Sequence, residues 1–177
     1  MKLLKLGMLI FLLSACASQI QPSVNYYVLP KPKLAHLSPL SGMSVTVSVA
    51  DYLKSKKILV VKAPHQLIYS TQHQWAESIS IGVERYLTRQ IDAKGQLPAI
   101  CNDKKACRLE IHLEQFNGSI SGNAYLSGSI SLMLDNKLNN SQFFYFEGQQ
   151  TEVGYSALIE QLVLLLNQLT DSIYSLE

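Results

Sequence analysis

The residue with the clearest chemical potential in this 177-residue chain is Cys16, whose thiol follows a short apolar run. Two lysines, at positions 2 and 5, precede the hydrophobic residues 6–13, and the small pair Ser14-Ala15 leads to the cysteine. A charged start, an apolar segment and a small-residue cleavage site are typical of a secretory signal. The run is too short to span a bilayer, which takes roughly 20 residues. We therefore predict a signal peptide over residues 1–15.

The sequence Leu13-Ser14-Ala15-Cys16 resembles the lipobox of bacterial lipoproteins. This resemblance implies that Cys16 is diacylated on sulfur, becomes the mature N-terminus and is then acylated on nitrogen, with fatty acids such as palmitate. Each buried methylene contributes about 0.8 kcal/mol, so several chains on one residue form a lasting anchor. The alternative is an ordinary cleaved signal with an incidental cysteine. Ala17 stands where an inner-membrane lipoprotein typically has aspartate, which implies the periplasmic face of the outer membrane.

The two other cysteines, Cys101 and Cys107, are separated by a short, largely polar segment. An exported chain enters an oxidising compartment, so we predict that this even pair forms a disulfide. A redox-active pair would more typically read C-x-x-C, and a zinc site would need further ligands nearby, which the sequence does not provide. We expect no metal and no cofactor.

The remaining candidates for chemistry do not combine into a catalytic motif. The four histidines are scattered along the chain: His36, His65, His73 and His112. None adjoins a G-x-S-x-G or H-E-x-x-H sequence, and the chain has no P-loop. Glu110 and Glu114 share one face of a predicted strand, but no partner acid is present to shift their pKa values. We predict that the protein is not an enzyme.

Net charge and chain length further limit the functions and the number of domains that the protein can have. The precursor carries 15 basic and 13 acidic side chains, and Lys2 and Lys5 belong to the leader, so the mature chain is neutral. Neutrality offers no electrostatic basis for binding nucleic acid. The mature length suits one domain with a real core. We predict a flexible tether over residues 16–24 and a single periplasmic domain over residues 25–177.

Strands are predicted where apolar residues alternate or cluster between turn residues. The predicted ranges are 26–29, 44–49, 58–61, 66–70, 108–115, 120–134 and 141–150. Asn117-Gly118 is the strongest hairpin signal, and a second turn is expected at 135–137 and 139–140. In the strand 141–150, aromatic residues on both faces suggest one buried face and one contact surface.

Helices are predicted over residues 74–91 and 155–176, where apolar residues recur at three- and four-residue spacing. Trp75 opens the stripe of the first helix. Two helices with one apolar stripe each would cover one face of a mostly antiparallel sheet, which is a two-layer α+β sandwich. The stripe of the second helix is wide enough to touch the sheet and the other helix, with an oligomer or partner seam as the alternative.

Several segments, taken in order, resemble the ABC-type transport auxiliary lipoprotein family, the PqiC (YmbA) group. They are the lipobox at Cys16, Tyr26-Tyr27-Val28-Leu29, Val45-x-Val47-x-Val49, Tyr52-Leu53, Ile58-Leu59-Val60, Trp75-Ala76-Glu77 and the closing amphipathic helix. The resemblance covers nearly the whole mature chain. Trp75, Tyr52 and Leu53 are the expected anchors of a partner or of the core.

The resemblance implies a non-catalytic adaptor. Family members work with an MCE-domain protein that forms a tube across the periplasm and with an inner-membrane protein. The system is thought to move lipids between the membranes and to protect the envelope. The lipoprotein would sit under the outer membrane as a homo-oligomeric ring that receives the tube. The alternative is a structural or assembly lipoprotein of another outer-membrane machine, like the lipopolysaccharide-assembly lipoprotein.

Overall fold

The computed structural model describes residues 23–32, 43–94, 101 and 106–175. The predictions for the signal peptide, for Cys16, for His36 and for most of the tether lie outside the described residues. Seven strands form one sheet: β1 (Asn25–Tyr27), β2 (Met43–Val49), β3 (Lys57–Ala63), β4 (Gln66–Trp75), β5 (Cys107–Ser119), β6 (Asn123–Leu134) and β7 (Lys137–Gln149). The helical elements are a 3-10 turn, η1 (Asp51–Leu53), and two helices, α2 (Ile79–Lys94) and α3 (Tyr155–Tyr174).

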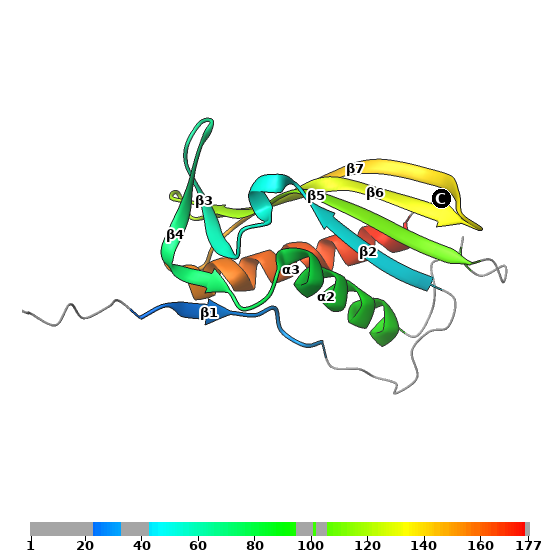
Figure 1. Ribbon diagram of the computed structural model, residues 1–177, viewed down its shortest axis with the longest axis horizontal. Helices are drawn as coiled ribbons and strands as arrows, with labels where there is room; N and C mark the ends of the chain where they lie inside the picture. The colour runs from blue at the N-terminus through cyan, green and yellow to red at the C-terminus, as the bar shows by residue number, and fades with distance from the viewer. Residues whose placement is uncertain (1–22, 33–42, 95–100, 102–105, 176–177) are drawn as a thin grey trace, which may run out of the picture.

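The antiparallel meander β5–β6–β7 is the longest part of the sheet (Figure 1). Leu109, Ile111 and Leu113 of β5 are buried, whereas Glu110 and His112 face away from the core. This alternation is the one predicted, because successive side chains of a strand point to opposite faces. Inward residues of β6 continue the same buried face.

Strand β7 has one face on the core, as its aromatic residues predict, and one exposed face, for which a contact role stays a prediction. Phe144 and Phe146 pack against the core, whereas Phe143 is 83% exposed and Tyr145 is also exposed. The turn before β7 is shorter than predicted: only Asp135 and Asn136 form it, with φ values of 49° and 63°. Two positive φ values are typical of a two-residue hairpin turn, so residues 139–140 already belong to the strand.

The other edge of β5 is shared by two strands. Its first part pairs in parallel with β2, from Cys107 opposite Met43 to Leu113 opposite Val49. Its last part pairs in parallel with β3, at Gly118 and Ser119. The sheet therefore combines parallel and antiparallel pairs, and its path runs β1-β4-β3-β5-β6-β7 with β2 beside β5.

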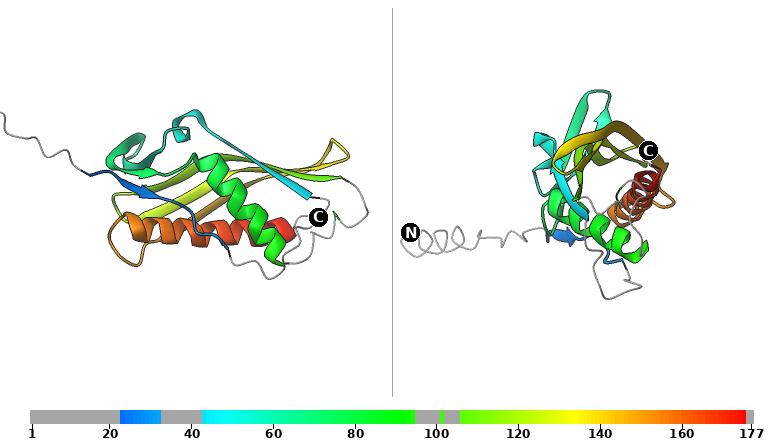
Figure 2. Two further views of the ribbon diagram at one scale, coloured as in Figure 1. Left: turned by 60° about the horizontal axis from the view of Figure 1, so that its bottom comes forward. Right: turned by 90° about the vertical axis from the view of Figure 1, so that its right-hand side faces the viewer.

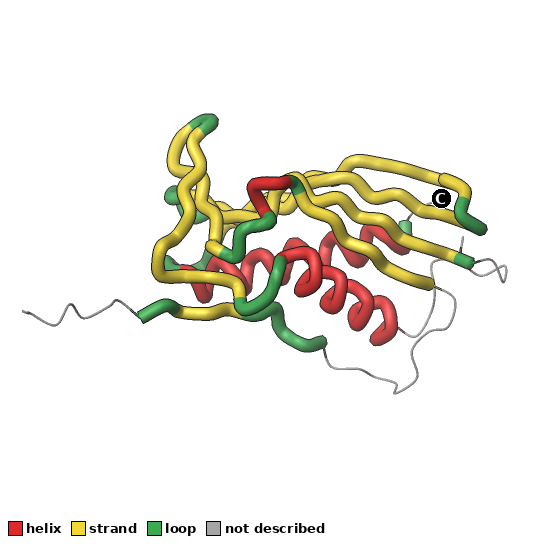
Figure 3. The backbone as a smooth tube through the Cα atoms, in the orientation of Figure 1, coloured by secondary structure: helices red, strands yellow, loops and turns green. Residues whose placement is uncertain are grey.

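Both helices lie on one side of the sheet, which curves around them (Figure 2). The tube drawing shows the same two layers, with the β3–β4 hairpin rising from the sheet (Figure 3). The stripe of α3 is buried as predicted, through residues that include Leu158, Leu162, Leu165, Leu166, Leu169 and Ile173. The predicted α+β class is confirmed, and α3 contacts the meander and α2 together.

The first helix begins later than predicted. Residues 74–75 are the end of β4, not the start of a helix, because β1 pairs with them: Tyr26 lies opposite Gln74 and Tyr27 opposite Trp75. Pairing with β1 therefore satisfies the backbone groups of residues that the side-chain pattern had assigned to the helix. Helical pairing starts at Ser78, whose carbonyl accepts from the Gly82 N–H at 3.0 Å.

The prediction of a hairpin turn at Asn117-Gly118 was wrong. Both residues lie inside β5, because β6 pairs with them on one edge and β3 joins Gly118 on the other. The chain turns at residues 120–122 instead, where Gly122 has a φ of 87° and donates its N–H to the Ser119 carbonyl at 3.1 Å. A positive φ of this kind favours glycine.

Candidate docking site

The side chains that could do chemistry are dispersed over the described part of the chain. His112 contacts the Ser48 hydroxyl through Nδ1 at 3.0 Å, and His73 contacts the Tyr27 hydroxyl through Nδ1 at 2.9 Å. His65 lies in the turn between β3 and β4. No group of three or more metal-ligating side chains occurs among the described residues. The histidines and carboxylates that the sequence singled out are therefore not brought together there.

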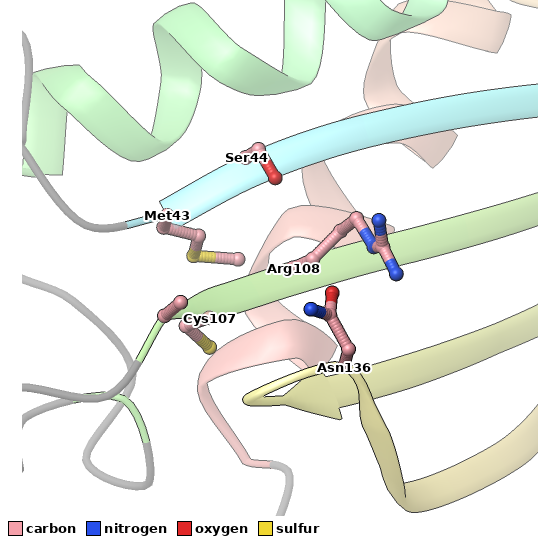
Figure 4. Close-up of a pocket in the computed structure, with 6 residues that line it drawn as sticks. Met43, Ser44, Cys107, Arg108 and Asn136 are labelled. Atoms are coloured by element: carbon pink, nitrogen blue, oxygen red, sulfur yellow. The ribbon is translucent and has the colours of Figure 1, made fainter.

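Cys101 and Cys107 form a disulfide, as predicted. Cys107 begins β5 and lines a hollow of about 350 Å³ together with Met43, Ser44 and Asn136. Figure 4 shows these side chains around the start of β2 and β5. The only charged residue of this lining, Arg108, pairs with Glu110 at 3.0 Å. Its charge is thus already partnered within the chain.

Tyr52 and Leu53 sit at a bulge in β5. Leu113 pairs with Gly128 and Gln115 with Ser127, so Glu114 is the extra residue. The Tyr52 hydroxyl donates to the Glu114 carbonyl, and Leu53 is buried. Burial of the ring and the nearby Glu114 charge raise the pKa of Tyr52. The pair holds the connection between β2 and β3 at the point where β5 changes partners.

Trp75 is a core residue of the sheet. It is 4% exposed and lies 5.5 Å from Phe116, ring centre to ring centre. Its backbone N–H donates to the Lys56 carbonyl. The indole therefore packs inside the domain.

A larger hollow lies at the opposite end of β5 from the disulfide. It is a groove of about 500 Å³ between the β3–β4 hairpin, the β5–β6 turn, the loop after β7 and the start of α3. We call it the hairpin groove. Its apolar lining comprises Val60, Ile68, Ile120, Val153, Tyr155 and Leu158, and its polar lining comes mainly from residues 119–122 and 149–152. Pockets that hold organic ligands have this size and this mixture of apolar walls and a few polar groups.

The hairpin groove adjoins the strand that carries the N-terminal segment. Tyr155, which lines the groove, stacks on His73 with 3.9 Å between ring centres. The Tyr27 ring lies 6.5 Å from Tyr155 and belongs to β1. Sequence reasoning missed this site because its walls come from four separate segments. The available signal was the presence of apolar Ile120 and Val153 at turn positions.

Neither α-helix in the described part of the chain is both apolar and long enough to cross a bilayer. The site geometry therefore consists of one two-layer α+β domain with a mostly apolar groove at one end and a disulfide at the other.

Two solved structures share this fold. One is a crystal structure of an uncharacterized protein with a TM-score of 0.71 and 20% identity, covering 86% of this chain and 97% of the other. The second is a DUF330 protein from Xanthomonas campestris with a TM-score of 0.68 and 18% identity, covering 84% and 92%. These likenesses show a common fold across almost the whole domain. No curated protein matches the chain significantly.

The sequence itself carries the family assignment. The family model described as "ABC-type transport auxiliary lipoprotein component" matches residues 27–174. The chain therefore belongs to the ABC-type transport auxiliary lipoprotein component family, as the ordered motifs predicted.

Proposed function

We propose that this protein is the lipid-anchored, non-catalytic adaptor of an MCE-type intermembrane lipid transport system. The observation that carries the proposal is the family match over residues 27–174. In this proposal Cys16 holds the acyl chains, the domain faces the periplasm under the outer membrane, and identical subunits form the dock for a periplasm-spanning MCE protein.

Three features support this assignment. The lipobox precedes a domain that starts only a few residues later, so the body stays close to its anchor. The mature chain is neutral, which suits a protein that binds through shape and apolar contacts rather than through a charged field. The hairpin groove offers an apolar surface on the side of β1.

The anchor is tested by replacing Cys16 with serine and labelling cells with a clickable fatty acid. We expect label on the parent protein, no label on C16S, and recovery of the parent in the outer-membrane fraction. Equal labelling of both proteins, or a parent found free in the periplasm, would reject the anchor.

The partner is tested separately by crosslinking in whole cells, followed by purification of this protein from solubilised envelopes. Recovery of an MCE-domain protein and of an integral inner-membrane transport protein is the expected result. Recovery of an outer-membrane barrel protein without an MCE protein would instead assign the chain to an assembly machine. C16S serves as the control, because an unanchored chain should lose the partner that is held at the membrane.

A further inference from the structure

The walls of the hairpin groove are suited to a hydrocarbon chain. Val60 and Ile68 from the β3–β4 hairpin and Leu158 from α3 contribute aliphatic surface, and Tyr155 contributes an aromatic ring. Burying apolar surface of this kind stabilises a complex by about 25 cal/mol per Å². The lining contains one charged residue, Glu152, and no cation. A phosphate group would find no positive partner in this lining, whereas an acyl chain needs none.

The rim of the hairpin groove carries exposed apolar side chains in a turn and a loop, where the backbone does not require them. Ile120 is 68% exposed at the β5–β6 turn, and Val153 is fully exposed in the loop before α3. Ile68 on the hairpin is also exposed. Apolar side chains gathered around a concave site are typical of a surface that meets lipid or another molecule.

The groove lies at the tethered end of the domain. β1 begins at Asn25, which pairs with His73, and His73 stacks on Tyr155 of the groove. In Figures 1 and 2 the start of β1, the start of α3 and the β5–β6 turn lie at the same end of the molecule. The nine residues from Cys16 to the residue before Asn25 can extend about 30 Å at most. A chain anchored at Cys16 therefore keeps the groove within reach of the bilayer surface.

We propose that the hairpin groove binds one long acyl chain of a membrane phospholipid, with the headgroup outside. This inference deepens the proposed function and rests on its membrane anchor. The aliphatic walls hold the chain, and Ile120 and Val153 cover it at the rim. The polar residues 149–152, which also line the groove, would face the end of the chain that joins the headgroup.

The test uses the purified full lipoprotein reconstituted into vesicles of phosphatidylethanolamine and phosphatidylglycerol. The vesicles contain a trace of phosphatidylethanolamine with a photoreactive diazirine in the middle of one acyl chain. After irradiation, crosslinked peptides are mapped by mass spectrometry on the whole sample. We expect label in the peptides that contain Ile68, Ile120 and residues 149–158. Ile120→Asp should reduce this label about tenfold, because burial of an isoleucine side chain is worth that much in binding.

Ile81→Asp is the matched control, because Ile81 is 60% exposed on α2 and lies outside the groove. It should leave the label unchanged. Val153→Asp is a second rim variant, which covers the case that I120D folds poorly; circular dichroism checks all three proteins. A probe with the diazirine in the headgroup should not label the groove.

Flotation of the same sample distinguishes the two proposals. A protein that floats without groove label overturns the acyl-chain site and leaves the adaptor function standing. Groove label without flotation supports the site and rejects the anchor. Equal loss of label in I120D and I81D, equal label from the headgroup probe, or label from a photoreactive free fatty acid but not from the phospholipid would each overturn the proposal.

Discussion

The two parts of β5 on either side of its bulge have the same β6 neighbour but different partners on the other edge. Residues 107–113 pair with β2 at every position, whereas β3 pairs only with Gly118 and Ser119. The first part begins at the disulfide and is closed on both edges. The second part leaves space between the hairpin and the β5–β6 turn, and the hairpin groove occupies that space. Continuous pairing makes a closed sheet, and a short pairing leaves an open groove.

The bulge between the two parts is the most sensitive point. A Cβ on Gly128 would lie 1.9 Å from the His112 carbonyl oxygen, which belongs to the backbone and cannot move aside. We expect Gly128→Ala to destabilise the domain by about 3–5 kcal/mol, measured by urea unfolding. Gly154→Ala is the matched control, because Gly154 also has a positive φ but open space around it. Similar losses in both variants would contradict the steric explanation.

The role of the second part of β5 is tested by placing a larger side chain at Gly118. A Cβ there would lie 2.8 Å from the Leu158 side chain, which lines the groove. Since the side chain can shift, Gly118→Val should cost about 1–3 kcal/mol. We also expect weaker acyl-chain crosslinking, with hydrogen exchange of residues 107–113 unchanged. Faster exchange there would show that the two parts are not independent.

The first part is tested by removing the disulfide in the double variant Cys101→Ser/Cys107→Ser. The bond closes a loop with a sequence separation of 6, so the chain-entropy model gives a loss of about 2 kcal/mol. Thermal unfolding measures the loss, and hydrogen exchange should increase at residues 107–113 but not at residues 115–119. An unchanged free energy of unfolding in the double variant would show that the disulfide does not stabilise the first part of β5.

The contact between α2 and α3, in the helix layer under β2, is tested at Tyr86. Its hydroxyl donates to Asn167 Oδ1 at 2.7 Å and accepts from Gln90 Nε2 at 2.8 Å, which ties α2 to α3. Tyr86→Phe should cost about 1 kcal/mol.

Burial raises the pKa of Tyr86 above its ordinary value of 10.0. The folded state therefore holds this proton more tightly than the unfolded state. The resulting stability is fully present below pH 10 and is lost as pH rises through the raised pKa. Between pH 9 and 11, the free energy of unfolding should fall less steeply with rising pH in Y86F than in the parent protein. An identical slope in both proteins would contradict this role.

The strands of the meander and the stripe of α3 were predictable because local periodicity decides which side chains can share a buried face. Leu109, Ile111 and Leu113 alternate, and Leu158, Leu162 and Leu169 recur at helical spacing, so one window of sequence contains the information. The Cys101–Cys107 disulfide was predicted from the even pair of cysteines and from the export that the predicted signal peptide implies.

The errors occur where a distant strand supplies backbone partners. β1 keeps Gln74 and Trp75 extended, and β3 pairs with Gly118 and Ser119 and so continues β5 beyond the predicted turn. No local propensity reports a partner that lies about fifty residues away, and tertiary pairing overrides the weaker local preference.

The sequence by itself determined the class of fold, the two apolar helix stripes and the family, whereas the leader and Cys16 stay predictions. Only the tertiary structure decided the β5 bulge, its change of partner from β2 to β3, and the hairpin groove. The physical reason is that periodicity acts within one segment, whereas a concave surface needs side chains from four segments to meet. Ile68, Ile120 and Val153 therefore acquire a common position only when the sheet has closed around α3.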